Sequence, residues 1–374
     1  MTKGLHLTLM MGPVVAVPVP RDVVDALTSV QVTTSAGQRS GFQLVFAVSK
    51  DSLITKVLLP AGFFDPRTRV ILMATVNGLP QVLMDGVVTR QELTPSSTPG
   101  GSKLTVTGED VSVMMDLIDV TGFPFPAMPV EARVAVIIAK YFLYGLVPLV
   151  IPSFLQDTPI PIERIPQQNG TDLAYVQQLA RDAGHVFYVE PGPLPGMNLA
   201  YWGPEVRIGL PQPALNINMD MDTNVESLTF SLDGLSRKQL VVMIQEPNTK
   251  ITIPIPVPDF SILKPPLAAR PALPLKVEPL RDTANKDPLR AALLGLSAAS
   301  NSADAVTGTG TLDVLRYGRM LKARALVGVR GAGLAYDGLY YVKSVTHSIK
   351  RGEYKQNFSL ARGGLVSITP RVIP

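Results

Sequence analysis

Short runs of alternating apolar and polar residues dominate the first hundred positions and predict β-strands. The clearest runs are residues 43–48, 69–76, 81–93 and 103–107. Asn77-Gly78 separates two of them, and Asp85-Gly86 lies within another and marks a turn or bulge. Residues 5–19 are apolar but broken by prolines, which favours a first strand and a turn over a leader segment. This part predicts a small antiparallel barrel or sandwich.

The pattern changes to helical spacing in the middle of the chain. Residues 108–118 predict a strand end that runs into a short helix. Residues 171–183 predict a helix with Thr171 as its N-cap and Gly184 as its stop, and its apolar positions form one stripe. The strand predicted over residues 185–190 follows at once, so this region has α/β character.

An apolar run over residues 134–151 carries Lys140 near its centre. Its 18 residues stand at the lower limit for crossing a bilayer. We expect instead a helix over residues 131–144, buried and ending near Gly145, and no membrane insertion.

Proline then interrupts the regular pattern. Strands are predicted over residues 227–232 and 239–245, and ten of the 42 residues in 247–288 are proline. Because proline lacks the backbone N–H, this segment predicts an extended arm outside the barrels. Residues 291–310 are small and polar and predict a flexible tether.

The last part predicts a helix over residues 312–325 and three strands, at residues 326–330, 339–349 and 353–360. In the long strand, alternation places Lys343 and Val345 on one face.

Residues 69–107 and 324–360 share an order of strand, Asp-Gly, long strand, turn and strand, over 39 and 37 residues. This order suggests two similar barrels, although few residue identities support the repeat.

The pattern as a whole predicts a mainly β protein with an α+β middle region: two tube-like antiparallel β-barrels, an α/β hub domain and a proline-rich insertion. The expected divisions are a first barrel over 1–107, a hub domain over 108–205, a second barrel over 206–245 and 306–365, an insertion and tether over 246–305, and a tail over 366–374.

Composition adds two constraints. Apolar residues make up 46 % of the chain and charged residues only 17 %, so partner subunits are expected to cover much of the surface. Cysteine is absent, which excludes disulfides and thiolate zinc sites.

The charge is unevenly distributed along the chain. Residues 311–374 hold 11 Lys or Arg against 3 Asp or Glu, a net charge of about +8, whereas the rest of the chain carries about −4. Such a basic end can bind nucleic acid or an acidic protein.

Candidate catalytic and cofactor chemistry is weak. The three histidines, His6, His185 and His347, are far apart in sequence and predict ordinary surface or rim positions. The glycines of residues 328–333 precede a predicted strand, so they indicate a β-turn and not a dinucleotide loop. Asp220 and Asp222 could bind calcium, but a solvated loop is favoured. We predict no metal, no cofactor and no enzyme activity.

Three blocks resemble the late-control-D-like baseplate hub family, which includes contractile phage hubs and the N-terminal region of type VI secretion spike proteins. They are KLTVTGEDVSVMMDL, DLAYVQQLARDAGHVFYVE and YGRMLKARALVGVRGAGLAYDGLYYVKSVTHSIKRGEYKQNFSLARGGL, at residues 103–117, 172–190 and 317–365. The resemblance implies a homotrimer in which three chains supply six barrels.

That ring would match a sixfold tail tube protein above and a threefold spike below, with baseplate wedge or sheath components around it. The chain ends nine residues after Leu365, so the spike is expected to be a separate protein. Assembly is expected in the cytoplasm, as part of a phage tail or phage-tail-like particle. The basic residues expected at an interface or channel are Arg316, Arg319, Lys322, Arg324, Lys343, Lys350, Arg351 and Lys355.

Two other functions stay open from the residues alone. One is a tail-tip cell-wall hydrolase, since any two acids can converge in space. The other is a basic nucleic-acid-binding tail component, in which aromatics interleaved with Lys and Arg would stack on bases. Those aromatics are Tyr336, Tyr340, Tyr341 and Tyr354.

Overall fold

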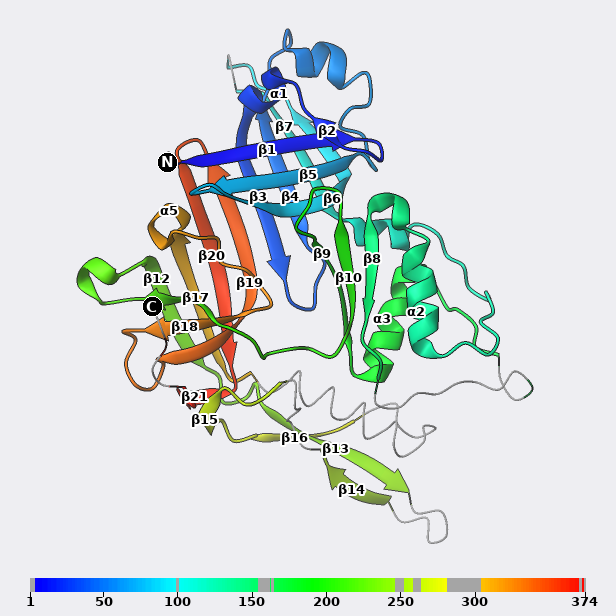
Figure 1. The fold of residues 1–374 in the computed structure, drawn as a ribbon, viewed down its shortest axis with the longest axis vertical. Coiled ribbons are helices and arrows are strands. Elements are labelled where there is room, and N and C mark those ends of the chain that lie inside the picture. The colour runs from blue at the N-terminus through cyan, green and yellow to red at the C-terminus, as the bar shows by residue number, and fades with distance from the viewer. Residues whose placement is uncertain are drawn as a thin grey trace.

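The computed structural model describes residues 4–98, 101–153, 162, 165–245, 252–257, 264–280, 304–369 and 372. A largely antiparallel sheet of 13 strands runs through these residues and forms the body of the molecule (Figure 1). Two sets of six strands make up most of it.

The first strand set has the order β3-β4-β7-β6-β5-β1, and the two-residue strand β2 (Val17–Pro18) pairs with the end of β1. The helix α1 (Arg21–Ala26) precedes β3, and the π-helix η1 (Ile54–Leu58) follows β4. Alternation predicts β4, β5, β6 and β7, and the apolar residues 5–19 predict β1, but no prediction covers β3. Their bounds are β1 Leu5–Gly12, β3 Leu27–Ser35, β4 Gly41–Ala47, β5 Arg69–Val76, β6 Leu79–Thr94 and β7 Lys103–Asp110.

The second strand set repeats that order as β12-β17-β20-β19-β18-β11. One pairing differs: β1 lies antiparallel to β5, whereas β11 lies parallel to β18. Apart from the direction of this pairing, the two sets share one strand order, as an internal repeat would. The bounds are β11 Gln212–Asn216, β12 Val225–Leu232, β17 Val306–Asp313, β18 Leu326–Arg330, β19 Gly338–Lys350 and β20 Glu353–Arg362.

The two sets join edge to edge through β3 and β19, which pair antiparallel from Ser35↔Ser344 to Ser29↔Lys350. One apolar core runs through both sets and includes Leu44, Val106, Val342 and Val345, each fully buried.

The helix predicted over residues 312–325 is wrong. Strand β17 continues to Asp313, and α5 (Val314–Tyr317) is a single turn that Gly318 ends with a φ of +82°. The Asp313 carboxylate caps this turn by accepting from the backbone N–H groups of Leu315 and Arg316. Most of the expected helix is instead an irregular segment that leads into β18.

The flexible tether predicted up to residue 310 is also wrong from Val306 onward, because β17 begins there. Its glycines have a packing reason. A Cβ on Gly308 would stand 2.9 Å from the Phe230 ring, and one on Gly310 would stand 2.6 Å from the Phe358 ring. Small residues thus let aromatic side chains of β12 and β20 pack over the strand. Residues 291–303 of that prediction lie outside the described residues.

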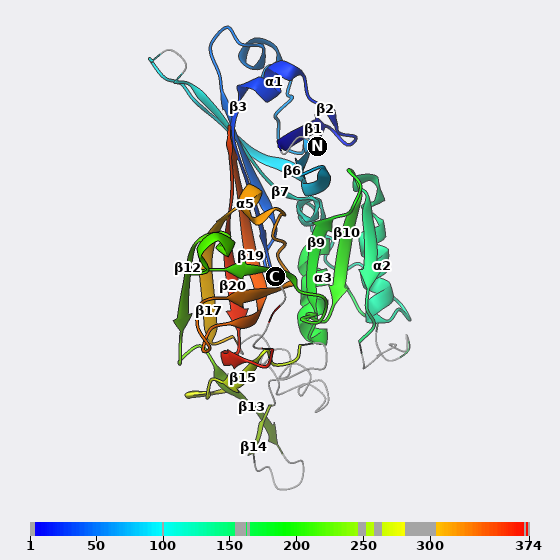
Figure 2. The same ribbon diagram turned by 60° about the vertical axis from the view of Figure 1, so that its left-hand side comes forward.

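A middle domain, residues 111–203, stands beside the two strand sets (Figure 2). Its sheet has the order β8-β10-β9, and its separate core contains the fully buried Trp202. Helix α3 confirms its predicted caps, since Thr171 Oγ1 accepts from the Ala174 N–H and Gly184 has a φ of +71°. The bounds are η2 Val111–Asp116, α2 Val130–Ala139, η3 Phe142–Tyr144, β8 Leu146–Val150, α3 Asp172–Ala183, β9 Val186–Pro191 and β10 Asn198–Gly203.

The apolar run over residues 134–151 divides into the end of α2, the 3-10 turn η3 and strand β8, so the helix predicted over residues 131–144 is confirmed only as far as Ala139, and η3 follows it up to Gly145. Gly145 adopts a φ of +72° between the turn and the strand. Among the described residues, no helix is long and apolar enough to cross a membrane.

The proline-rich part forms short strands at the end of the molecule away from β1 and β2 (Figures 1 and 2). Strand β13 lies between β14 and β16, so the prolines occupy edge strands, as their missing N–H requires. Residues 239–245, expected in the second barrel, belong to this separate sheet. The bounds are β13 Lys238–Gln245, β14 Thr252–Pro256, β15 Ala268–Pro271 and β16 Lys276–Pro279, and β15 pairs with β21 Gly364–Ser367.

Candidate assembly surface

A face rich in hydroxyl and amide side chains crosses the second strand set and continues onto β3. Its side chains hydrogen-bond across strands: Thr311 Oγ1 donates to Asn357 Oδ1 at 2.7 Å, and the hydroxyls of Ser344 and Ser359 lie 2.8 Å apart. A shallow depression of about 380 Å³ lies on this face. Because side chains alternate across a sheet, the apolar core takes the other face. The sheet thus presents a neutral, polar wall.

The eight basic residues singled out from the sequence do not form one cluster. Lys350 and Lys355 lie toward one end of the hydroxyl face, near the β19–β20 turn, and Lys355 Nζ pairs with Glu226 at 3.0 Å and Glu353 at 3.3 Å. Arg351 is in that turn and donates to the Asp25 carbonyl. Arg316 is exposed on α5.

Alternation places Lys343 and Val345 on the same face of β19, but Lys343 is exposed and Val345 is fully buried. The register against β20 shifts between Val342 and Ser344, so a β-bulge at Lys343 breaks the alternation. Val342 and Val345 can therefore both enter the core. The simple period of two was wrong at this point.

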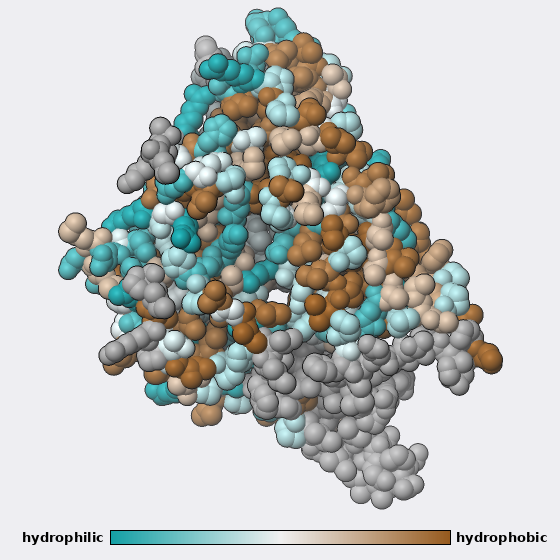
Figure 3. Space-filling view, viewed as in Figure 1, coloured by the Kyte–Doolittle hydropathy of each residue, from teal (hydrophilic) through white to brown (hydrophobic). Residues whose placement is uncertain are grey.

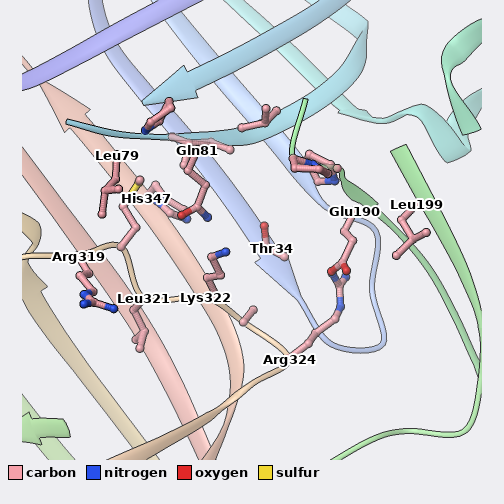
Figure 4. Close-up of a pocket in the computed structure, with 18 of the residues that line it drawn as sticks. Thr34, Leu79, Gln81, Glu190, Leu199, Arg319, Leu321, Lys322, Arg324 and His347 are labelled. Carbon is pink, nitrogen blue, oxygen red and sulfur yellow. The ribbon is translucent and has the colours of Figure 1, made fainter. Parts of the chain in front are cut away.

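The remaining three, Arg319, Lys322 and Arg324, line a groove of about 720 Å³ between the two strand sets and the middle domain (Figure 4). Lys322 projects into it, while Arg324 and Glu190 face each other. Arg324 Nη1 lies 3.6 Å from Glu190, its guanidinium stacks 4.0 Å above the Tyr188 ring, and Nη2 donates to the Ser35 carbonyl at 2.8 Å. Arg324 therefore fixes the middle domain against the β3–β19 junction.

A second buried joint connects the middle domain to the first strand set. Asp85 accepts two hydrogen bonds from Arg69 and one from Asn198 Nδ2, all between 2.8 and 2.9 Å. Arg69 also donates to the carbonyls of Tyr144 and Gly196. The sequence suggested only a turn or bulge at Asp85, which instead lies buried inside β6. An acid and an arginine within apolar runs were the signal that could have revealed the pair.

A third group of buried charges ties the proline-rich part to the body. Arg207 forms a bidentate pair with Asp304 at 2.6 and 2.8 Å, and Lys264 Nζ lies 2.6 Å from Glu205. Burial alone would raise the pKa of Asp304, but the hydrogen bonds and charge of Arg207 lower it below its ordinary value. With two positive and two negative charges in contact, this cluster balances itself.

His347 is not on the surface or rim, as the sequence suggested. It is buried in β19, and its Nδ1 lies 2.7 Å from the Tyr354 hydroxyl. Burial lowers the pKa of His347 to about 4.

The tyrosines of the basic stretch pack the core. Tyr340, Tyr341 and Tyr354 are at most 3 % exposed, and Tyr336 stacks on Phe230 with ring centres 5.0 Å apart. Buried rings cannot offer a stacking platform to bases. Tyr340, Tyr341 and Tyr354 therefore give the nucleic-acid-binding alternative no support, and the partly buried Tyr336 is already stacked on Phe230.

Exposed apolar side chains gather on the middle domain, where the molecular surface is broadly hydrophobic (Figure 3). They include Phe142 and Leu143 of η3 and Val147 of β8, which are 68, 61 and 42 % exposed. A patch of this kind on one face is typical of surfaces that bind another protein.

Several solved structures share the fold of this chain, and their names describe tail and secretion-spike proteins. No protein-family model and no curated protein matches the chain. A tail protein from Neisseria meningitidis MC58 superposes with a TM-score of 0.62 at 14 % identity, covering 97 % of this chain and 98 % of that one. The 43 kDa tail protein of prophage MuSo2 from Shewanella oneidensis gives 0.59 at 14 %, covering 96 % and 99 %.

A Francisella PdpA–VgrG complex matches all of this chain and 60 % of the other, with a TM-score of 0.58 at 8 % identity. At sequence identities this low, the structural similarity shows a common fold but not a common function. The TM-scores show that the mostly β architecture of this chain resembles their overall fold. The chain therefore has the fold of phage tail and type VI secretion spike proteins, as the resemblance to the late-control-D-like baseplate hub family predicts.

Proposed function

We propose that this chain is a structural hub of a contractile, phage-tail-like baseplate, where it forms a trimeric ring between a hexameric tail tube and a separate spike. The observation that carries the proposal is the presence of two strand sets with the same strand order in one chain. Three copies supply six such sets, so one ring can meet a sixfold tube on one side and a threefold spike on the other.

The hydroxyl face is proposed to line the axial channel of this ring. A neutral wall of Ser, Thr and Asn side chains offers no fixed charge to hold a passing cargo. Lys350 and Lys355 would then stand at one rim, where they suit an acidic tube subunit. The exposed apolar side chains of the middle domain would face the wedge or sheath components.

The test is the state of the purified chain and its place in the particle. Light scattering should give about 120 kDa, three times the chain mass of 40.2 kDa. Cryo-microscopy of assembled particles should show the chain between tube and spike, with threefold symmetry. A single copy or a twofold dimer at that position would refute the proposal.

A further inference from the structure

The two strand sets correspond residue by residue at their long strands. In β6 the register against β7 shifts between Val88 and Arg90, and in β19 the register against β20 shifts between Val342 and Ser344. Just before β5 and β18, Arg67 and Arg324 both have positive φ, +77° and +60°. Each donates a hydrogen bond of 2.8 Å from its backbone N–H, Arg67 to the Val88 carbonyl and Arg324 to the Val342 carbonyl. Residues 90–94 of β6 therefore match residues 344–348 of β19.

The outermost strands, β3 and β12, correspond equally well. Against its inner neighbour, β3 shifts register between Leu27 and Ser29, and β12 does so between Val225 and Ser227. Residues 29–35 therefore match residues 227–233.

One edge is occupied in the chain and its counterpart is bare. The outer edge of β3 pairs with β19 beyond the end of β18. Within the described part of the chain, no strand pairs with the outer edge of β12, and β5 leaves the edge of β6 after Val87. The burial agrees: Leu93 is 46 % exposed, whereas its counterpart His347 is 5 % exposed. Exposed strand edges of this kind are templates for pairing with another chain.

We infer that β12 of one copy pairs antiparallel with residues 90–94 of β6 in a second copy, in the register of the β3–β19 junction. This deepens the proposed function, on which it rests, by naming the strands that join the subunits. Because the two edges belong to different strand sets, the contact is head to tail and can close a ring.

The register makes chemical sense at each position. Translating the internal pairing places Arg90 opposite Asp233, two exposed side chains of opposite charge. Leu93 comes opposite Phe230, so two apolar side chains meet. Arg67 is exposed, and it would reach the carbonyl of Asp233 as Arg324 reaches that of Ser35. Opposite-charge and apolar cross-strand pairs both stabilise a sheet.

Cysteine cross-linking tests this register in a chain that has no cysteine of its own. The double variant Glu92→Cys, Ser231→Cys places thiols at the counterparts of Thr346 and Thr33, whose Oγ1 atoms lie 3.0 Å apart. Mild oxidation should link these thiols between copies. The variant Thr33→Cys, Thr346→Cys is the positive control, because it should link within one chain.

The matched negative control is Glu92→Cys, Leu232→Cys. Leu232 neighbours Ser231 in β12, so its side chain points to the opposite face and should not link. On a non-reducing gel, the Glu92→Cys, Ser231→Cys variant should give covalent trimer at least tenfold above this control.

The outcomes separate the two proposals. Protein that light scattering shows to be trimeric, but that links no more than the control, overturns the register and leaves the hub trimer standing. Monomeric protein without links overturns both. Linked products that extend beyond the trimer support the strand pairing and refute the closed threefold ring.

Discussion

The buried histidine at the β3–β19 junction should make the protein sensitive to mild acid. The pKa of His347 falls from 6.5 to about 4 on folding, so below pH 6.5 the unfolded chain binds this proton more readily than the folded one. The stability that depends on neutral His347 is therefore intact above about pH 6.5. It is lost as the pH falls from there toward 4.

The magnitude follows from about 1.4 kcal/mol for each unit of pKa difference. Protonation of His347 should lower the free energy of unfolding by about 2 kcal/mol at pH 5 and about 3 kcal/mol at pH 4, relative to pH 7. Because His347 is only 5 % exposed, solvent screening removes little of this effect. The variant His347→Gln keeps a polar group beside the Tyr354 hydroxyl but cannot take up the proton.

Urea unfolding at one protein concentration, repeated from pH 7 to pH 4, measures the effect. Carboxylates will contribute to acid loss in every variant, so the informative quantity is the difference between His347→Gln and the wild type. That difference should grow by about 3 kcal/mol across the range. The variant His6→Gln, which changes an exposed histidine, should follow the wild type. Parallel curves for His347→Gln and the wild type would refute the reasoning.

Three further predictions concern charges. Asp85→Ala should destabilise the chain by about 3–5 kcal/mol in urea unfolding, because it strands the buried guanidinium of Arg69, and a loss under about 1 kcal/mol would contradict the buried joint. Arg90→Glu should weaken the trimer, because it places two negative charges opposite each other, and adding Asp233→Arg should restore it. If light scattering shows that the double variant forms no more trimer than Arg90→Glu alone, the Arg90–Asp233 pair is refuted. Reversing Lys343, Lys350 and Lys355 to Glu should leave the circular dichroism unchanged, because solvent-contacting charges contribute little to folding, and should reduce particle yield. Normal particles with unchanged cargo would show that the three lysines belong to an ordinary solvated face.

The strands were predictable where alternation and turn residues agree. Residues 69–76 and 326–330 are strands with the predicted bounds, and α3 has both predicted caps. The failures occur where a distant contact decides the local structure. Gly308 and Gly310 look like tether residues, yet they are strand positions because Phe230 and Phe358 pack over them.

The candidate surface was less predictable than the fold. Net charge drew attention to Arg324, but its role depends on Tyr188 and Glu190, which lie far away in sequence. The pairing of β3 with β19 has no local signal, because it joins residues that are far apart in the chain, such as Thr33 and Thr346, which are separated by 313 positions. The bulge at Lys343 was equally hidden, since it depends on register against β20.

The junction between β3 and β19 also has a consequence for synthesis. Thr33 and its partner Thr346 are 313 positions apart in the chain. At roughly 5–20 residues per second, the ribosome needs roughly 15–60 s to make the second strand after the first has emerged. Throughout that interval the nascent chain carries an unpaired β3 edge, which is open to wrong partners on the same polysome. Chaperone binding to the N-terminal segment, or slow translation of the residues between β3 and β19, would therefore affect yield more than the stability of the finished protein.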